Sequence, residues 1–507
     1  MFDLVIRGGE VLDGTGTPAV RADLGVRDGR IEALGDLAGA EAGGTIDATG
    51  RYLLPGFVDT HCHAESAVFD PATQQALLRQ GVTTVLLGQD GLSYAPGSPS
   101  TVDFVVRYFG AIFGRHPTFR GGRVAELLAS YDRATPVNAA YLVPHGTIRY
   151  DVLGAARRPP EQDELAAMRR LVEEGLEDGA AGLSSGLEYV PGRYGDASEL
   201  TYLCAPLGAR PYVTHLRGYG PRAALGMGEA SEIARLAPVP LHVSHYHGPA
   251  PQLTGLLDEA GDVTFDSYPY TRASSILAMV ALPDWLPTAD LAATTAALRD
   301  AAVRDRLRAE WPDDLWPRIR LACVFHPDWA WAEGLTLADA AARAGLDPAE
   351  FTLDLLVADK LRVGCVFERR PPTTEESVRT LLRDDRHTGG SDAIYLGGHP
   401  HPRGYGAFAR LLGVHVRALG DWTWPQAAVH LAARPAARFG LVGRGLLQRG
   451  YWADVAIVDP ALVADRATYD APRELAVGID DVLVNGVPVL AGGTLTGRRA
   501  GRALGDG

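Results

Sequence analysis

The chain has 507 residues, of which 46% are hydrophobic and 22% are charged, so it is too long for one small core and has the composition of a globular protein. A large domain with a smaller one is the natural expectation. The formal net charge of −14 comes from 62 acidic and 48 basic residues with no long run of one sign, a balance that argues against nucleic acid as a partner.

Both ends of the chain have the pattern of short antiparallel strands. Residues 1–54 alternate apolar and polar positions around glycine-bearing turns, and residues 441–507 show the same pattern, for example in 453–458 and 481–486. We therefore expect the two termini to share one small β domain, with residues 55–440 as the large domain.

The large domain has the pattern of an α/β fold. Short apolar strands alternate with longer helical stretches rich in Ala, Leu and Arg, which is typical of repeated β-α units. Eight such strands predict a (β/α)8 barrel. The candidate strands end near His63, Asp90, His145, Ser185, His215, His245, Tyr268 and Asp392.

An insertion is expected before the last strand, over about 283–347, because the gap from Tyr268 to Asp392 is too long for one connection. Five of the eight tryptophans lie in it, and they most readily form the core of an inserted subdomain. Lining of a substrate pocket is the alternative interpretation. These residues are Trp285, Trp311, Trp316, Trp329 and Trp331.

The first barrel strand carries the clearest chemical signal. His61 and His63 are two positions apart, so their side chains leave an extended strand on the same face. A lone buried histidine is usually a core residue, but a His-x-His pair after an apolar strand predicts a metal site, because neutral imidazole is a common metal ligand.

Further polar side chains stand at other strand ends. His215 and His245 each follow an apolar run, His247 lies two residues further on, and Asp392 follows a Gly-Gly-Ser segment. Because the carboxyl ends of barrel strands meet at one mouth, we expect these groups to converge with the His-x-His pair. Asp392 is the predicted general base, since a carboxylate can take a proton from water activated by a metal.

These motifs resemble the N-acyl-D-amino-acid deacylases, or D-aminoacylases, of the amidohydrolase superfamily. The resemblance runs nearly end to end and implies a distorted TIM barrel with a small β-sandwich built by both termini. It rests on LPGFVDTHCH at 54–63, GVTTVLLGQDG at 81–91, GLSSGLEYVPG at 182–192, THLRGYG at 214–220, SHYHG at 244–248, DSYPY at 266–270, GGSD at 389–392, HPRGYGAFARLLG at 401–413 and GYWADVAIVDP at 450–460.

The resemblance implies that His215 and His245 hold the tighter zinc and that His61 and His63 belong to a second, weaker site. Two positions depart from the family: Asp90 stands in place of a cysteine ligand, and His247 in place of a lysine.

Asp90 is predicted to be a metal ligand, since a carboxylate can bind or bridge cations as a thiolate does, with a polar turn residue as the alternative. A carbamylated lysine is excluded as a bridge because the sole lysine, Lys360, is far from the fourth strand.

The predicted activity is metal-dependent hydrolysis of an amide, most readily the deacylation of an N-acyl-D-amino acid, with one or two divalent ions. Zinc is expected, with manganese or cobalt as alternatives. A related enzyme acting on another amide, such as a cyclic amide or a specialised metabolite, and a catalytically inactive scaffold are the competing hypotheses. The predicted substrate-binding residues are Arg403 as first choice for a carboxylate, Arg217 and Arg272 as further candidates, and Tyr189, Tyr268 and His247.

The expected surroundings are cytoplasmic. The N-terminal residues do not have the charge and apolar pattern of a signal peptide, and no apolar stretch has membrane-spanning length. The four cysteines, Cys62, Cys204, Cys323 and Cys365, are scattered, as expected of reduced thiols. The predicted partner is a small-molecule substrate, with neither nucleic acid nor membrane, and assembly into homo-oligomers is compatible with the sequence.

Overall fold

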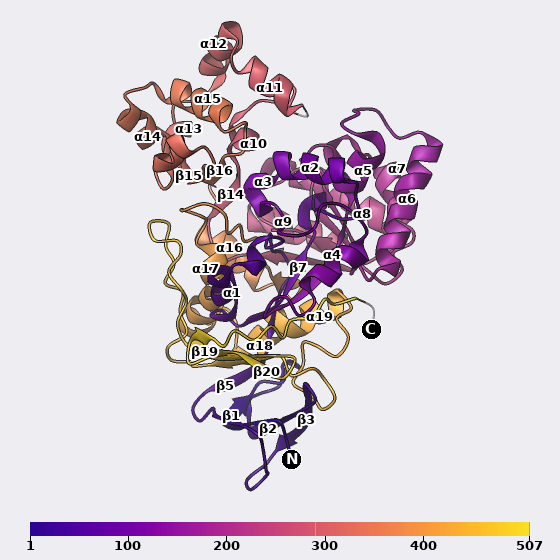
Figure 1. Ribbon diagram of the computed structural model, residues 1–507, viewed down its shortest axis with the longest axis vertical. Helices are drawn as coiled ribbons and strands as arrows, with labels where there is room; N and C mark the ends of the chain where they lie inside the picture. Colours follow the sequence, from indigo (N-terminus) through magenta and orange to yellow (C-terminus); the bar gives the residue numbers. More distant parts are fainter. Residues whose placement is uncertain (289, 506–507) are drawn as a thin grey trace.

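A barrel of parallel strands forms the centre of the computed structural model, which describes residues 1–288 and 290–505 (Figure 1). Most of its strands are buried along their full length, as expected when helices cover them from outside. In chain order the strands are β6 (Phe57–Asp59), β7 (Val82–Leu87), β8 (Asn138–Tyr141), β9 (Val143–Pro144), β10 (Leu183–Gly186), β11 (Tyr212–His215), β12 (Leu241–Val243), β13 (Val263–Ser267) and β17 (His387–Gly389).

The ring of strands is interrupted at one point and closed at another. Its third position is split, because β8 pairs with β7 whereas β9 pairs with β10. Beyond β17 the ring is closed by backbone hydrogen bonds from Thr60 N to Gly389 O (3.1 Å) and from Asp392 N to His61 O (2.7 Å). Counting β8 and β9 as one, the described residues form eight barrel positions, which confirms the predicted distorted (β/α)8 barrel.

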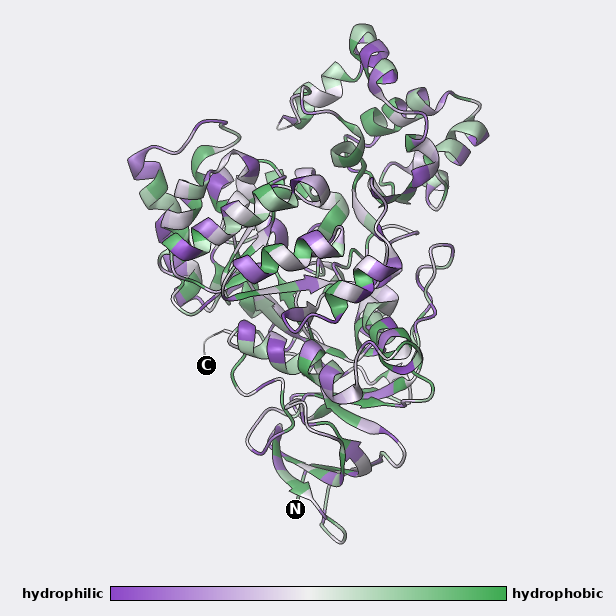
Figure 2. Cartoon of the chain, turned by 180° about the vertical axis from the view of Figure 1, so that it is seen from behind, coloured by the Kyte–Doolittle hydropathy of each residue, from purple (hydrophilic) through white to green (hydrophobic). Residues whose placement is uncertain are grey.

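Helices surround the barrel, and their banded purple and green colouring in Figure 2 reflects one polar and one apolar face. The first begins where Asp70 accepts a hydrogen bond from Ala72 N and Pro71 occupies the first turn. The helices are α1 (Pro71–Leu78), α2 (Pro99–Tyr108), α3 (Gly110–Phe113), α4 (Val124–Tyr131), α5 (His145–Leu153), α6 (Gln162–Glu177), α7 (Ala197–Cys204), α8 (Ala223–Leu236), α9 (Ala250–Glu259), α16 (Glu375–Leu382), α17 (Arg403–Arg410), α18 (Trp424–Ala428) and α19 (Arg434–Arg438), with short turns or π-helical segments η1 (Ala67–Phe69), η2 (Gln89–Gly91), η3 (Gly192–Tyr194), η4 (Gly220–Arg222), η6 (Leu411–Ala418) and η7 (Val429–Ala433).

Both termini build a second unit at one end of the molecule, where indigo and yellow segments meet in Figure 1. Strand β18 pairs antiparallel with β5, and Ile6, Leu24, Val455 and Ile457 share one apolar core. This confirms the predicted β-sandwich domain from both termini. Its strands in the described chain are β1 (Leu4–Val11), β2 (Val20–Arg27), β3 (Arg30–Gly35), β4 (Thr45–Asp47), β5 (Tyr52–Pro55), β18 (Val455–Val458), β19 (Ile479–Val484), β20 (Val487–Ala491) and β21 (Thr494–Leu495).

An inserted unit lies between β13 and β17, at the end of the molecule opposite the β domain (Figure 1). It is longer at both ends than residues 283–347, because its antiparallel sheet, in the order β14-β16-β15, spans 272–368. Its elements are β14 (Arg272–Ile276), α10 (Leu277–Ala281), α11 (Leu291–Ala297), α12 (Ala301–Glu310), α13 (Leu315–Arg318), β15 (Ile319–Cys323), η5 (Pro327–Ala332), α14 (Leu337–Ala344), α15 (Pro348–Ala358) and β16 (Gly364–Glu368).

The tryptophans of the insertion pack on one another and on its core. Trp311 meets Trp316 edge to face at 5.3 Å between ring centroids, and Trp329 and Trp331 lie 5.3 and 6.1 Å from the ring of Phe351. This arrangement supports the core interpretation. Among the described residues, no helix combines the length and apolar character needed to cross a membrane.

Candidate active site

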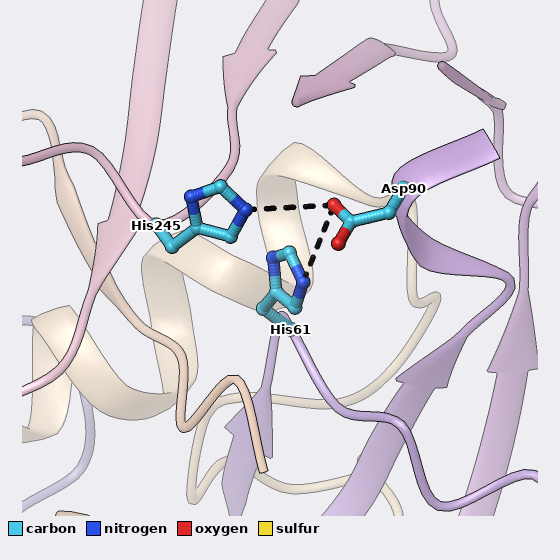
Figure 3. A group of neighbouring side chains, drawn as sticks. All are labelled: His61, Asp90 and His245. Carbon is cyan, nitrogen blue, oxygen red and sulfur yellow. Dashed lines mark ion pairs between the residues drawn. The ribbon is translucent and has the colours of Figure 1, made fainter. Parts of the chain in front are cut away.

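The six predicted metal ligands converge at the carboxyl ends of the barrel strands. His61 and His63 follow β6, Asp90 lies in η2 after β7, and His215 ends β11. His245 follows β12 and Asp392 follows β17, so residues more than 300 positions apart in sequence meet at one mouth. Figure 3 shows His61 and His245 pointing at the carboxylate of Asp90.

Two overlapping groups bring their ligand atoms within 4.8 Å of one another: His61, Asp90 and His245, and His61, His63 and Asp392. In the first group, Asp90 Oδ1 lies 3.6 Å from Nε2 of both His61 and His245. His215 adds to this group, because its Nδ1 is 2.9 Å from His245 Nε2 and 3.7 Å from Asp90 Oδ1. In the second group, Asp392 Oδ1 lies 3.4 Å from His63 Nε2 and 3.7 Å from His61 Nε2.

Three of these residues have left-handed backbone conformations that L-residues rarely adopt. The φ angles are 57° at Asp90, 34° at His245 and 49° at Asp392. The surrounding structure holds them there: Asp266 Oδ1 accepts a hydrogen bond from His245 N (2.9 Å), and Asp392 N donates to His61 O. Such strain, found at three residues of one cluster, is characteristic of functional sites.

The electrostatics of the cluster are dominated by its carboxylates. Burial by itself would lower the pKa of His61, but Asp266, Asp90 and Asp392 raise it to about 10. Burial would likewise raise the pKa of Asp90, but His61, His245 and His215 hold it well below its usual range. The cluster therefore favours a cation among ionised carboxylates.

The donor set fits a divalent metal ion. His61 Nε2 and Asp90 Oδ1 are both buried, face each other at 3.6 Å and have no hydrogen-bond partner among the described residues. Leaving such polar atoms unpartnered costs free energy, and a cation between imidazole nitrogens and carboxylate oxygens satisfies both kinds of atom.

Asp392 is held by a buried arginine. Arg403, which has no exposed surface, places Nη1 2.8 Å from Asp392 Oδ2. Burial by itself would raise the pKa of Asp392, but Arg403, together with His63 and His61, holds it well below its usual range. Asp392 is consequently ionised and oriented.

Asp266 is a further residue in contact with the cluster, and the sequence analysis did not identify it. Its Oδ2 lies 3.3 Å from His61 Nδ1 and 3.1 Å from His242 Nε2, so it orients the ring whose other nitrogen faces Asp90. A carboxylate behind a histidine is the usual arrangement around metal ligands. The available signal was its position in DSYPY at the end of the seventh barrel strand.

Glu188 was also missed. Its Oε2 lies 3.1 Å from His215 Nε2, the nitrogen on the far side of the ring from the cluster, and its Oε1 accepts a hydrogen bond from Arg222 (2.6 Å). Glu188 therefore does for His215 what Asp266 does for His61.

A cavity of about 790 Å³ opens over the cluster and extends to the inserted unit. Of the predicted substrate-binding residues, Tyr189, Tyr268 and His247 line it. Tyr189 also lies against the cluster, with its hydroxyl 3.1 Å from His215 Nδ1. His247 stacks on Tyr219, and burial, with the nearby Arg369, lowers its pKa well below the usual value, so its ring is neutral.

The other predicted substrate-binding residues do not face this cavity. Arg403 is fully buried beside Asp392 and is not among the described residues that line the cavity, so its contact with a substrate carboxylate stays a prediction. Arg217 pairs with Glu229 (2.8 Å), and Arg272 pairs with Glu368 (2.6 Å). Both guanidinium groups are therefore paired with carboxylates of this chain. None of the five tryptophans of the insertion is among the described residues that line the cavity.

The barrel, the terminal β domain and the histidine–carboxylate cluster together define a hydrolase of the amidohydrolase class. The family model described as "Amidohydrolase family" matches residues 44–490. The chain is 34% identical to a D-aminoacylase of Alcaligenes xylosoxydans xylosoxydans, over 99% of this chain and 97% of that protein. It is also 34% identical to an N-acyl-D-glutamate deacylase of the same organism, over 96% of this chain and 93% of that protein.

A solved structure agrees with these relatives. The N-acyl-D-glutamate deacylase of Bordetella bronchiseptica, complexed with zinc and a phosphonate inhibitor, superposes with a TM-score of 0.83 at 32% identity and full coverage of both chains. The chain therefore belongs to the D-aminoacylase family of the amidohydrolases. It is a hydrolase acting on carbon–nitrogen bonds other than peptide bonds.

Proposed function

We propose that this protein catalyses the metal-dependent deacylation of N-acyl-D-amino acids. The observation that carries the proposal is a buried cluster at the mouth of a barrel of this family. In this cluster His61 Nε2 and Asp90 Oδ1 lie 3.6 Å apart, and neither has a hydrogen-bond partner among the described residues. The relatives at 34% identity act on substrates of this class by name, and the cavity above the cluster has room for a small molecule.

Six residues would hold one or two divalent ions, with zinc as the proposed metal because imidazole and carboxylate donors suit it. His215, His245 and Asp90 would form the tighter site, and His61, His63 and Asp392 the second. When bound, such an ion lowers the pKa of water and polarises a carbonyl oxygen.

Asp392 is the proposed general base and acid. Its carboxylate, kept ionised by Arg403, accepts a proton from the water that attacks the acyl carbonyl. The same group then returns the proton to the amide nitrogen as the carbon–nitrogen bond breaks, which releases the amine of the D-amino acid. Tyr189 and Tyr268 line the cavity beside it and are proposed to position the substrate.

The test compares the N-acetyl derivatives of D- and L-amino acids as substrates, with acetate release as the readout. Chelated protein should be inactive, and reloading with zinc, manganese or cobalt should restore hydrolysis of the D series. Activity against cyclic amides alone would assign a different substrate to the same site, whereas protein that takes up no metal would contradict the proposal.

We also propose a cytoplasmic location, since all four cysteines are free and buried in the structure.

A further inference from the structure

Three arginines are among the described residues that line the cavity over the cluster, and two of them are neutralised by carboxylates. Arg222 pairs with Glu188 at 2.6 Å, and the exposed Arg370 pairs with Asp314. Arg369 has no carboxylate of the described chain within ion-pair distance. A half-buried guanidinium without a counter-charge, in a cavity beside a catalytic cluster, points to an anionic ligand.

Arg369 is held by neutral partners that fix its position and leave its charge uncompensated. It follows β16, and its Nη2 donates to the hydroxyl of Tyr268 (2.7 Å), while its Nη1 lies 3.4 Å from Thr373 Oγ1. A guanidinium has five N–H donors, so these two hydrogen bonds leave donors for a ligand.

Tyr268 connects this cation to the catalytic group. The guanidinium of Arg403 lies 4.5 Å from the centre of the Tyr268 ring, and the same arginine contacts Asp392. Arg369 therefore lines the same cavity as the general base, and both Arg369 and Arg403 contact Tyr268. An anion bound to Arg369 would therefore share the cavity with the carboxylate of Asp392.

We propose that Arg369 is the specificity-determining residue that binds the α-carboxylate of the substrate. The inference rests on the proposed function, because in an N-acyl-amino acid the carboxylate is separated from the amide nitrogen by a single carbon. The planar guanidinium fork matches a carboxylate with two parallel hydrogen bonds, which gives orientation as well as affinity.

The test compares N-acetyl-D-leucine with N-acetyl-D-leucinamide, which differs only in lacking the carboxylate charge. The zinc-loaded wild-type protein should prefer the acid in kcat/KM. Arg369→Gln should lower kcat/KM for the acid by about 10- to 100-fold and leave the amide nearly unchanged, since hydrogen bonds to a charged group are lost only with the acid. The ratio of kcat/KM for the acid to kcat/KM for the amide does not depend on the fraction of the variant that folds.

Arg370→Gln is the matched control, because it removes the same charge from the next residue, where Asp314 already neutralises it. It should keep the wild-type ratio. Equal losses for acid and amide in Arg369→Gln would make Arg369 a structural residue and overturn the inference, as would a wild-type protein without acid preference. If the wild type hydrolyses neither compound, the proposed function fails, and calorimetric binding of the same pair to the two proteins then decides the inference separately.

Discussion

At the residue scale, the carboxylate of Asp90 lies at the centre of the histidine–carboxylate cluster. Its oxygens are 3.6 or 3.7 Å from a ring nitrogen of every one of four histidines: His61, His63, His215 and His245. No other carboxylate of the described cluster reaches all four within ion-pair distance. We therefore propose that Asp90 is a ligand shared between two ions, with oxygen in place of the thiolate that the family resemblance would supply.

We predict that Asp90→Ala releases metal and abolishes activity together, because the tighter site then keeps only His215 and His245. Asp90→Cys should restore metal binding with a preference shifted toward zinc, since thiolate is the softer donor. Competition with a chelator measures the affinities of the three proteins. Affinity is the cleaner readout, because side chains arranged for a carboxylate limit the rescue of rate.

Asp103→Ala controls for the loss of a carboxylate, since Asp103 is an exposed residue of α2 that pairs with Arg115. Its metal affinity should equal that of the wild type. If Asp90→Ala also binds metal as tightly as the wild type, Asp90 is a polar turn residue and not a metal ligand.

Asp392→Asn is predicted to fold and keep its tighter metal but to lose about 10²- to 10⁴-fold in kcat, since an amide cannot accept the proton that the carboxylate takes. Arg403 then faces a neutral group in place of its 2.8 Å partner. Turnover and metal content are measured on the same preparation. Near wild-type turnover at full metal content would show that another group is the base.

At the element scale, β17 and η7 are joined by two buried histidines that hydrogen-bond to each other and stay neutral. His387 Nδ1 lies 3.3 Å from His430 Nδ1, and His430 also stacks on Trp422. Burial, with Arg434 nearby, lowers the pKa of His387 to about 3; burial, followed by His387 and Arg434, lowers that of His430 to about 2. In the unfolded chain both rings titrate near the ordinary pKa of about 6.5.

Acid should therefore destabilise this junction. Below pH 6.5 the two histidines take up protons in the unfolded chain but not in the folded chain. Their contribution to the free energy of unfolding is therefore fully present above pH 6.5 and is lost as the pH falls from there toward the folded pKa values. The loss is about 1.4 kcal/mol per pH unit for each ring. His430→Phe keeps an aromatic ring on Trp422 but does not titrate. Urea unfolding of metal-free protein at pH 7 and pH 5.5 should show a smaller loss of stability for the variant, and equal losses would refute the prediction.

Elements with a local signal were predictable from the sequence. The His-x-His pair at 61 and 63 and the strand-end histidines stand in short apolar runs, and barrel geometry then brings them together. Asp266 and Glu188 were missed because their roles depend on hydrogen bonds to rings from other strands. The bounds expected for the insertion, 283–347, are too narrow for the same reason. Strand β14 pairs with β16, which lies about ninety residues further along the chain.

The surroundings of Arg403 could not be predicted from its motif alone. Its motif indicated a substrate contact, but whether a guanidinium faces a cavity or a buried carboxylate is decided by packing, and here Asp392 takes it. Arg369 carried no motif signal at all. What distinguishes it is the absence of a counter-charge among the described residues around it, a property that only the three-dimensional arrangement has.

On the scale of the whole molecule, the cavity is built jointly by the barrel and the inserted unit. Phe109 and Ile112 come from the barrel side, and Met279, Val280 and Phe367 come from the insertion. These side chains give the cavity an extended apolar wall. The wall offers favourable burial to an apolar group, at about 0.8 kcal/mol for each CH₂ buried, and only desolvation cost to a charge.

The cavity should consequently select amino acids with apolar side chains. Among the described residues that line the cavity, every arginine except Arg369 is paired with a carboxylate of this chain. If Arg369 binds the α-carboxylate of the substrate, a carboxylate on the substrate side chain has no unpaired guanidinium to bind. N-acetyl-D-leucine and N-acetyl-D-phenylalanine should exceed N-acetyl-D-glutamate and N-acetyl-D-aspartate in kcat/KM by at least about tenfold, which corresponds to about 1.4 kcal/mol. Met279→Arg, which places a cation on the apolar wall, should narrow this gap. The chain is also similar to an N-acyl-D-glutamate deacylase. If the wild type prefers the D-glutamate derivative, the charge on the substrate side chain is bound elsewhere in the cavity, and the prediction is wrong.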